Sequence, residues 1–259
     1  MLFRSTIALL LTPLFLNGVT MSKRNPEADK YISRMLSKEI PYTVSVAETD
    51  FTIDHTSVYP PGKLSNMFAE YLFTENSIVK GKVVADIGAG CAALGILAAK
   101  HGAREVIATD INEHAISCIK ANAKNHGVDK KLKALTGNST DPLLPDYQGK
   151  IDILCAGIPW DTISEKEYEE VSAEAQGLSR AFYDIEDKLL TGILTSAKKL
   201  LSGDGKIFFT SSMRSIGRLK KISLSHGYMV HIVKERDIHR SEEHTSELQS
   251  PCNLVCRLL

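Results

Sequence analysis

Apolar residues recur along this chain in two periods that alternate from about residue 83 to residue 235. Short apolar runs predict β-strands, and longer segments with apolar positions three and four residues apart predict helices between them. Such alternation builds a doubly wound, mostly parallel sheet, so the expected fold class is α/β and Rossmann-like. The expected strands are 83–85, 106–108, 132–136, 151–156, 206–211 and 228–235, and the expected helices are 92–101, 113–126, 187–201 and 216–225.

The part of the chain before residue 83 predicts a smaller helix-and-strand unit. Residues 26–38 favour a short amphipathic helix, with Ile32, Met35 and Leu36 on one face. The other expected elements of this part are one or two strands within 42–53, a turn at 58–61 and a helix near 64–73.

A glycine-rich turn follows the strand predicted at 83–85. The strand ends in Asp86 and enters Gly88-Ala89-Gly90, and the next strand ends in a second acid, Asp110. Glycines allow the backbone to approach a ligand closely, and an acid at the end of the second strand lies where a ribose diol would bind. The unit therefore predicts a nucleoside-binding site.

Asp86 decides between two kinds of nucleoside ligand. A dinucleotide fingerprint places G-x-G-x-x-G before a helix whose N-terminus faces a pyrophosphate, and the frame Gly88-x-Gly90-x-x-Ala93 fits it only weakly. A carboxylate directly before the glycines would repel a pyrophosphate, but it suits a ligand that carries an ammonium group. A structural alternative stays open, in which both acids merely cap helices or face water.

The D-x-G-x-G pattern, with the second acid 24 residues after the first, resembles the class I S-adenosylmethionine (SAM) methyltransferases. The resemblance covers about residues 58–236 and is strongest to the methyltransferase small-domain group, with the ribosomal-protein and release-factor enzymes nearest. It implies SAM as the cofactor, with the first acid and the glycines at its methionine end and the second acid on its ribose hydroxyls. The cofactor residues that it implies are Asp86, Gly88, Gly90, Asp110, Ile111 and Asn138.

Asn138 marks a departure from the family pattern at the end of the third strand. The family usually has Gly-Asp there, where the acid binds the adenine amino group, and this chain has Gly137-Asn138. An asparagine can still accept that hydrogen bond through its amide oxygen.

The end of the fourth strand carries the segment Gly157-Ile158-Pro159-Trp160. Amino-group methyltransferases of the release-factor glutamine and nucleic-acid-base types have Asn-Pro-Pro-Tyr at this place, where the Asn and a backbone carbonyl accept hydrogen bonds from the target. Here the Pro-aromatic pair is kept and the amide is absent, which puts glutamine-type recognition in doubt. A carbonyl of Gly157 or Ile158 could still accept, and Trp160 could stack on the target, or it could be a plain core residue. The candidate catalytic residues are Gly157, Pro159 and Trp160.

Two further features border this candidate acceptor site. Asp161 could act as an acid or a base, although a helix-capping or solvated role is favoured. Residues 165–180 are rich in acids and are expected to form a lid or insertion beside the target.

The resemblance implies a SAM-dependent methyltransferase that acts on an acceptor nitrogen, on a protein or on a nucleic-acid base. Methyl transfer is an in-line displacement that depends mostly on positioning the acceptor, so no catalytic base need be visible. Two alternatives remain: a small-molecule N- or O-methyltransferase, and a nucleotide-binding module without catalysis.

Both ends of the chain resemble sequences of technical origin. Residues 240–250 and 253–259 match the translated read-through of a common sequencing-library adapter, and residues 1–5 match its reverse complement. The expected organisation is a non-native upstream segment at 1–20, an N-terminal helix and strands at 21–57, a truncated SAM-binding methyltransferase domain at 58–239 and an adapter-derived tail at 240–259.

This organisation has a consequence for the sheet. The family sheet has seven strands, and its last strand is antiparallel and inserted between the fifth and the sixth. The natural chain is expected to stop just after the sixth strand, so we expect the native last strand to be absent. Residues 253–259 are apolar and could occupy its place by chance.

Charge and cysteine content describe the expected setting. The 31 basic residues balance the 31 acidic residues, which argues against strong non-specific binding of polyanions. Cys91, Cys118 and Cys155 are scattered without metal-ligand spacing, which fits a reducing compartment. The His residues show no metal motif, and the apolar run at 7–16 is too short to span a bilayer. We expect a cytoplasmic protein with no metal and no membrane partner.

Overall fold

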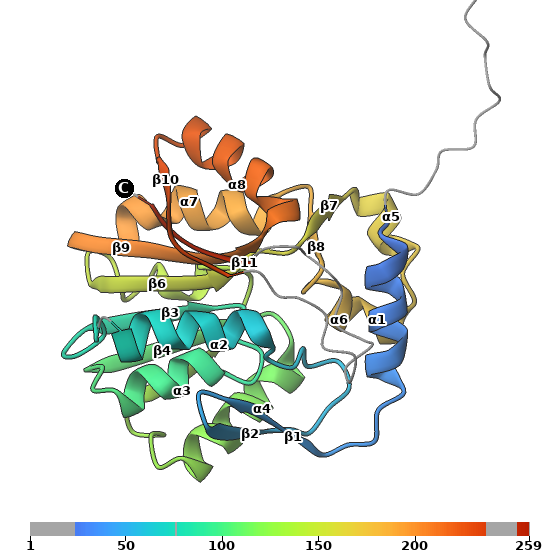
Figure 1. The fold of residues 1–259 in the computed structure, drawn as a ribbon, viewed down its shortest axis with the longest axis horizontal. Coiled ribbons are helices and arrows are strands. Elements are labelled where there is room, and N and C mark those ends of the chain that lie inside the picture. Colours follow the sequence, from blue (N-terminus) through green and yellow to red (C-terminus); the bar gives the residue numbers. More distant parts are fainter. Residues whose placement is uncertain (1–23, 76, 237–252, 259) are drawn as a thin grey trace, which may run out of the picture.

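The computed structural model describes residues 24–75, 77–236 and 253–258. Within them, a seven-stranded sheet forms the centre and two two-stranded sheets accompany it (Figure 1). The strands are β1 (Tyr42–Val46), β2 (Thr49–Ile53), β3 (Val83–Ile87), β4 (Glu105–Asp110), β5 (Leu132–Thr136), β6 (Ile151–Gly157), β7 (Asp161–Ile163), β8 (Tyr183–Ile185), β9 (Leu201–Ser212), β10 (Val230–Arg236) and β11 (Asn253–Leu258).

Helices follow most of the central strands. The helix expected near 64–73 is an α-helix, α2, that continues as a π-helix, η1. No helix among the described residues has both the length and the apolar composition that crossing a bilayer requires. The helices are α1 (Pro26–Leu36), α2 (Lys63–Ala69), η1 (Glu70–Glu75), α3 (Ala93–Lys100), α4 (Glu113–Asn125), η2 (Asp141–Leu143), α5 (Glu165–Glu169), α6 (Ala173–Ser179), α7 (Lys188–Leu200) and α8 (Met213–Ser225).

The carboxyl ends of the central strands meet at one edge of the sheet. The strand order is β10-β11-β9-β6-β3-β4-β5, and the five strands from β9 to β5 run parallel. The register places Asp86 opposite Ala108, and Asp110 opposite Thr136. Ligands of open α/β sheets bind in the crevice at this edge. The expected Rossmann-like α/β fold with a mostly parallel sheet is confirmed.

The place of the family's last strand is filled by β11. This strand lies between β9 and β10 and runs antiparallel to both, with Val255 opposite Thr210 and Cys256 opposite Ile232. We expect the native last strand to be absent and residues 253–259 to be able to occupy its place, and β11 lies in that place. That these residues derive from an adapter stays a prediction.

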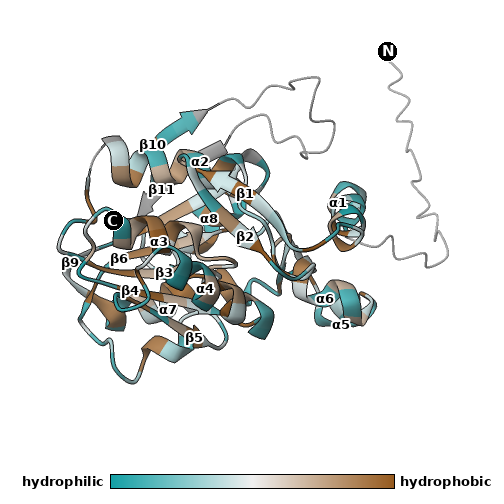
Figure 2. Ribbon diagram, turned by 90° about the horizontal axis from the view of Figure 1, so that it is seen from below, coloured by the Kyte–Doolittle hydropathy of each residue, from teal (hydrophilic) through white to brown (hydrophobic). Residues whose placement is uncertain are grey.

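Apolar side chains pack on both faces of the sheet, as the alternation of side chains along a strand requires. Val84 and Val106 belong to a buried cluster with residues of α2, α3 and α4. Ala85 and Ile107, one position further on, belong to a second cluster with residues of α7 and α8. Figure 2 shows hydrophobic residues gathered along the sheet and hydrophilic residues around the outside of the fold. Helices α2, α3 and α4 pack on one face of the sheet and α7 and α8 on the other. These two layers stabilise the sheet whose carboxyl edge forms the candidate site.

A third cluster lies to one side of the sheet and joins α1 to the segment between β6 and α7. Ile32 of α1 is buried there together with Phe182, and α1 packs beside α6 (Figure 1). Asn25 caps the helix by accepting a hydrogen bond from the Glu27 N–H (3.0 Å). The amphipathic helix predicted at 26–38 is confirmed, two residues shorter at its end.

Candidate cofactor and acceptor site

A cavity of about 550 Å³ opens at the carboxyl edge of the sheet. Its size is within the range of sites that hold a small ligand. Residues from the ends of β3, β4, β5 and β6 share this one volume. The lining includes every residue that the sequence predicts for the cofactor and acceptor sites, namely Asp86, Gly88, Gly90, Asp110, Ile111, Asn138, Gly157, Pro159 and Trp160.

The turn after β3 depends on glycine. Gly88 and Gly90 have φ angles of 67° and 58°, in the left-handed region that glycine adopts without steric cost. The Ala89 N–H donates to the carbonyl of Thr109 (3.0 Å), which ties the turn to the end of β4. A Cβ added to Gly90 would lie 3.2 Å from the carbonyl oxygen of Tyr59. The segment at Tyr59 therefore lies against the turn and forms a wall of the cavity.

Gly90→Ala is expected to lower the free energy of unfolding by about 1–2 kcal/mol, because alanine is strained in a left-handed conformation. It should also weaken SAM binding about 10-fold by moving the turn away from Tyr59, an effect of about 1.4 kcal/mol. Thermal denaturation and calorimetric titration with SAM measure the two effects. Gly127→Ala is the matched control, because Gly127 has a φ of 65° but its Cβ would meet nothing within 4 Å. Equal SAM affinity in the two variants would contradict this expectation.

Asp86 is buried beneath α3. Only 4% of the residue is exposed, and its Oδ2 accepts a hydrogen bond from the Gly95 N–H (2.9 Å). Gly95 is in the first turn of α3, so the carboxyl satisfies one of the N–H groups that a helix start leaves unpaired. Burial raises the pKa of Asp86 to about 7, although the hydrogen bond from Gly95 acts to lower it. Asp86 thus caps a helix, as the structural alternative expects, and also lines the cavity.

Asp110 joins the glycine turn to the start of α4. Its Oδ2 accepts from the Gly90 N–H and its Oδ1 from the Asn112 N–H, each at 2.9 Å. Burial raises the pKa of the Asp110 carboxyl, and the hydrogen bonds from Asn112 and Gly90 oppose this. A carboxylate oxygen can accept more than one hydrogen bond, so Asp110 can hold both the turn and a ligand hydroxyl. Ile111 beside it is 43% exposed and gives the cavity an apolar wall.

Asn138 is held near Asp110 because the loop after β5 is bonded to the end of β4. The Gly137 N–H donates to the Asp110 carbonyl (3.0 Å), and the Thr109 hydroxyl donates to the Ser139 carbonyl (2.9 Å). Asn138 itself is exposed and lines the cavity. This place is compatible with the contact to an adenine amino group that the resemblance implies.

The segment after β6 also lines the cavity. Gly157 is exposed, whereas Ile158 and Pro159 are buried, and the Ile158 N–H donates to the carbonyl of Thr210 in β9 (2.9 Å). Trp160 is half-buried and packs edge-on against Phe182, with ring centroids 5.1 Å apart. Trp160 therefore belongs both to an aromatic cluster and to the wall of the cavity.

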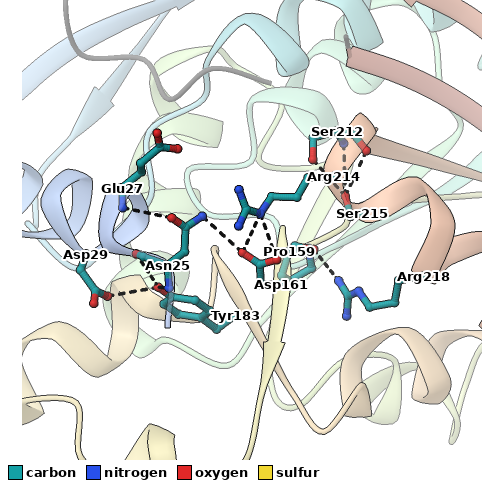
Figure 3. A network of polar contacts seen from close by, with 10 residues as sticks. All are labelled: Asn25, Glu27, Asp29, Pro159, Asp161, Tyr183, Ser212, Arg214, Ser215 and Arg218. Atoms are coloured by element: carbon teal, nitrogen blue, oxygen red, sulfur yellow. Dashed lines mark hydrogen bonds and ion pairs between the residues drawn. The ribbon is translucent and has the colours of Figure 1, made fainter. Parts of the chain in front are cut away.

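Asp161 forms an ion pair with Arg214. The sequence predicts an acid or base, a helix cap or a solvated group at this position, and not an ion pair. Its carboxylate accepts from the Arg214 Nε at 3.0 Å and from the Asn25 side-chain amide at 3.3 Å (Figure 3). Its side chain is 24% exposed, so it is neither a helix cap nor a freely solvated group.

The cavity wall also contains residues that the sequence analysis did not single out. Some of these residues come from the segment 165–180, which contains α5 and α6 and which we expect to form a lid or insertion. This segment lies beside the cavity, as predicted. Tyr183 and Asp184 belong to β8, a strand of three residues that is too short to give a periodic signal. The added residues include Tyr31, Glu165, Gly177, Arg180, Tyr183, Asp184, Lys188, Thr210 and Ser212.

Cys91 lies in the glycine turn with 2% of its surface exposed. Burial raises the pKa of its thiol far above the usual range, which suits a packing role rather than a nucleophile. In the part of the chain that the structure describes, no three His, Cys, Asp or Glu side chains form a group that could hold a metal ion.

Comparisons with known proteins agree with this geometry. Residues 71–165 match the family model of ribosomal protein L11 methyltransferase (PrmA). The chain is 29% identical over 145 residues to a bifunctional methyltransferase of Rickettsia bellii, covering 55% of this chain and 25% of that protein. It is 35% identical over 101 residues to the electron transfer flavoprotein beta subunit lysine methyltransferase of Mus musculus, covering 39% of this chain and 37% of that protein. The chain thus spans about a quarter to two fifths of the length of these two relatives.

A solved structure shows the same fold. The structure of P. horikoshii TYW2 in complex with MeSAdo aligns with a TM-score of 0.55 and 14% identity, covering 85% of this chain and 71% of that one. The resemblance predicted from the sequence is therefore confirmed: this chain has the fold and the sequence signature of the class I SAM-dependent methyltransferases.

Proposed function

We propose that this protein transfers the methyl group of SAM to a nitrogen atom on another protein. The observation that carries the proposal is the placement of two carboxyls, the buried Asp86 and the half-buried Asp110, at adjacent strand ends in one cavity. The glycine turn lies between them and is bonded to Asp110 through the Gly90 N–H.

The donor and acceptor groups of the cavity fit SAM part by part. Asp86 supplies a carboxylate for the ammonium group, and the glycine turn lets the backbone come close to the methionine end. Asp110 accepts the ribose hydroxyls, and Asn138 and Ile111 offer a polar and an apolar contact to the adenine. When bound, SAM supplies the activated methyl group.

Asp86 also argues against a dinucleotide in the same cavity. A pyrophosphate placed at the start of α3 would lie near the Asp86 carboxyl, which is already bonded to the Gly95 N–H of that helix start. Two anions in a buried site repel each other strongly. A cationic ligand instead favours the ionised form of Asp86.

A protein acceptor is supported by the matched family model, which is named for ribosomal protein L11, and by a relative named for a lysine of the electron transfer flavoprotein beta subunit. Gly157 is exposed in the cavity, where its backbone carbonyl can accept a hydrogen bond from the N–H of the acceptor. Trp160 offers an apolar surface to the side chain that carries the acceptor nitrogen. In this reaction the protein's part is to hold the acceptor nitrogen in line with the methyl carbon.

The test is transfer of label from tritiated SAM to the separated protein, RNA and small-molecule fractions of a bacterial lysate. The proposal expects label in protein, at a methylated nitrogen after hydrolysis and amino-acid analysis. Label confined to RNA or to small molecules would support the corresponding alternative acceptor. Saturable SAM binding without any transfer would support a binding module.

A further inference from the structure

Two arginines of α8 hold the segment Gly157–Trp160, here called the acceptor tip, from outside the cavity. Arg218 donates through Nη2 to the carbonyl of Pro159, and Arg214 donates through Nε to the Asp161 carboxylate directly after the tip (3.0 Å). Figure 3 shows both guanidinium groups reaching from one helix to this segment. Residues four apart lie on the same face of a helix, so one face of α8 presents both groups.

Arg218 connects the tip to the start of α7. Its Nη1 donates to Asp187 Oδ1 at 2.7 Å and lies 3.5 Å from Asp184 Oδ2. Asp184 is 2% exposed and accepts the N–H groups of Leu189 and Leu190 in the first turn of α7. A guanidinium bonded to a backbone carbonyl and to two carboxylates is held in one orientation. The carbonyl that it binds is fixed with it.

The backbone is strained where Arg218 meets α7. Glu186 and Asp187 have φ angles of 52° and 58°, a left-handed conformation that is uncommon for residues with a side chain. The turn presents the Asp187 carboxylate to Arg218. Such conformations persist only where the surroundings enforce them, and they cluster at functional sites.

The helix that carries the arginines is anchored at the cavity. Ser212 lines the cavity and begins α8, where its N–H donates to the Ser215 hydroxyl (3.3 Å) in a capping box. The two hydroxyls lie 3.2 Å apart, and Figure 3 shows both side chains at the start of the helix. The first turn of α8 therefore has a defined position relative to the cavity.

We propose that Arg214 and Arg218 are positioning residues that fix the acceptor tip for methyl transfer, in the absence of the asparagine side chain that related tips carry. The inference rests on the proposed function. Arg218 occupies the Pro159 carbonyl, so the tip meets the acceptor through Gly157 and Trp160 instead. A tip released from the arginines would bind SAM unchanged but would hold the acceptor nitrogen in line less often.

The experiment compares Arg218→Met, Arg218→Lys and Arg214→Met with a matched control, Lys221→Met. Lys221 is an exposed cation on the same helix and does not line the cavity. Each variant is measured for SAM affinity by calorimetry, for kcat and KM in label transfer to lysate protein, and for amide hydrogen exchange at Ile158.

The expected result is a SAM affinity within about 2-fold of the parent protein in all four variants. The value of kcat should fall about 100-fold in Arg218→Met, the loss that a misplacement of about 1 Å can cause. The value of kcat should fall only about 10-fold in Arg214→Met, because Arg218 still binds the Pro159 carbonyl. In Arg218→Lys kcat should lie between those of the parent and of Arg218→Met. The Ile158 amide should exchange faster in both methionine variants than in Lys221→Met.

A folded Arg218→Met with the parent kcat would overturn the proposal, as would a loss of SAM affinity that parallels the loss of kcat. If Arg218→Met does not fold, the same criteria apply to Arg218→Lys and Arg214→Met. Should the parent protein transfer no label, the proposed function fails. Hydrogen exchange then decides alone. If exchange at Ile158 is unchanged in the methionine variants, Arg214 and Arg218 do not fix the acceptor tip; faster exchange supports this role.

Discussion

Replacing Asp110 by alanine is expected to lower the affinity for SAM by about 100-fold or more. A hydrogen bond to a charged group contributes about 1.5–3 kcal/mol, and in the proposed function the carboxylate accepts two ribose hydroxyls. The substitution also leaves the N–H groups of Gly90 and Asn112 without their present acceptor, so the glycine turn loses its tie to α4. Calorimetric titration with SAM measures the loss.

The control for this variant must separate binding from folding. Asp146→Ala removes an exposed carboxylate that does not line the cavity, and it should leave SAM affinity unchanged. Circular dichroism and a thermal transition establish that Asp110→Ala is folded before it is titrated. A folded Asp110→Ala that binds SAM within about 3-fold of the parent would contradict the assigned role, since 3-fold is only about 0.65 kcal/mol.

Replacing Asp86 by asparagine is expected to stabilise the protein at alkaline pH and to impair SAM binding at the same time. Burial raises the pKa of this carboxyl from its usual 3.8 to about 7, so the folded state favours its neutral form. An asparagine is neutral at every pH and can still accept the Gly95 N–H. It avoids the cost of a buried charge, but it offers no anion to the ammonium group of SAM.

The effect has a defined pH window. In the parent protein the neutral Asp86 contributes its full stability below about pH 4, and that contribution is lost as pH rises through about 7. Asp86→Asn should therefore match the parent near pH 4 and exceed it above pH 7, by up to about 4 kcal/mol. Urea denaturation at several pH values measures the difference.

Asp152→Asn is a control with the opposite sign. At Asp152 burial acts to raise the pKa, but the hydrogen bonds from Val83 and Ser202 outweigh it, and the pKa is lowered. Its contribution to stability is present at neutral pH and is lost as pH falls through the lowered pKa. Asp152→Asn should thus destabilise at pH 7, where Asp86→Asn stabilises. A lower free energy of unfolding of Asp86→Asn than of the parent at pH 8 would show that the ionised Asp86 carboxyl does not destabilise the folded protein.

The cofactor side of the site could be predicted because its residues are the ends of buried strands. Asp86 and Asp110 each follow an apolar run, and parallel strands bring their carboxyl ends to one edge. The positive φ of Gly88 and Gly90 follows from the same local pattern. These signals lie within about 30 residues of sequence, so a single chain reveals them.

The acceptor side could not be predicted in the same way, because it depends on contacts between distant segments. Arg218 meets the Pro159 carbonyl across 59 residues, and Asn25 meets the Tyr183 hydroxyl across 158. No local periodicity encodes such pairs. The sequence offers the four-residue spacing of Arg214 and Arg218, but Arg214 lies two residues before the helix predicted at 216–225. Such a spacing is equally typical of a solvated helix face.

The cavity is expected to bind SAM rather than a dinucleotide. The most direct measurement is calorimetric titration of the protein with SAM and, separately, with NAD⁺, at pH 8, where Asp86 is largely ionised. We predict saturable binding of one SAM per chain, competition by S-adenosylhomocysteine, and no binding of NAD⁺. Saturable NAD⁺ binding by a folded protein that does not bind SAM would contradict the assignment of this cavity as a SAM site.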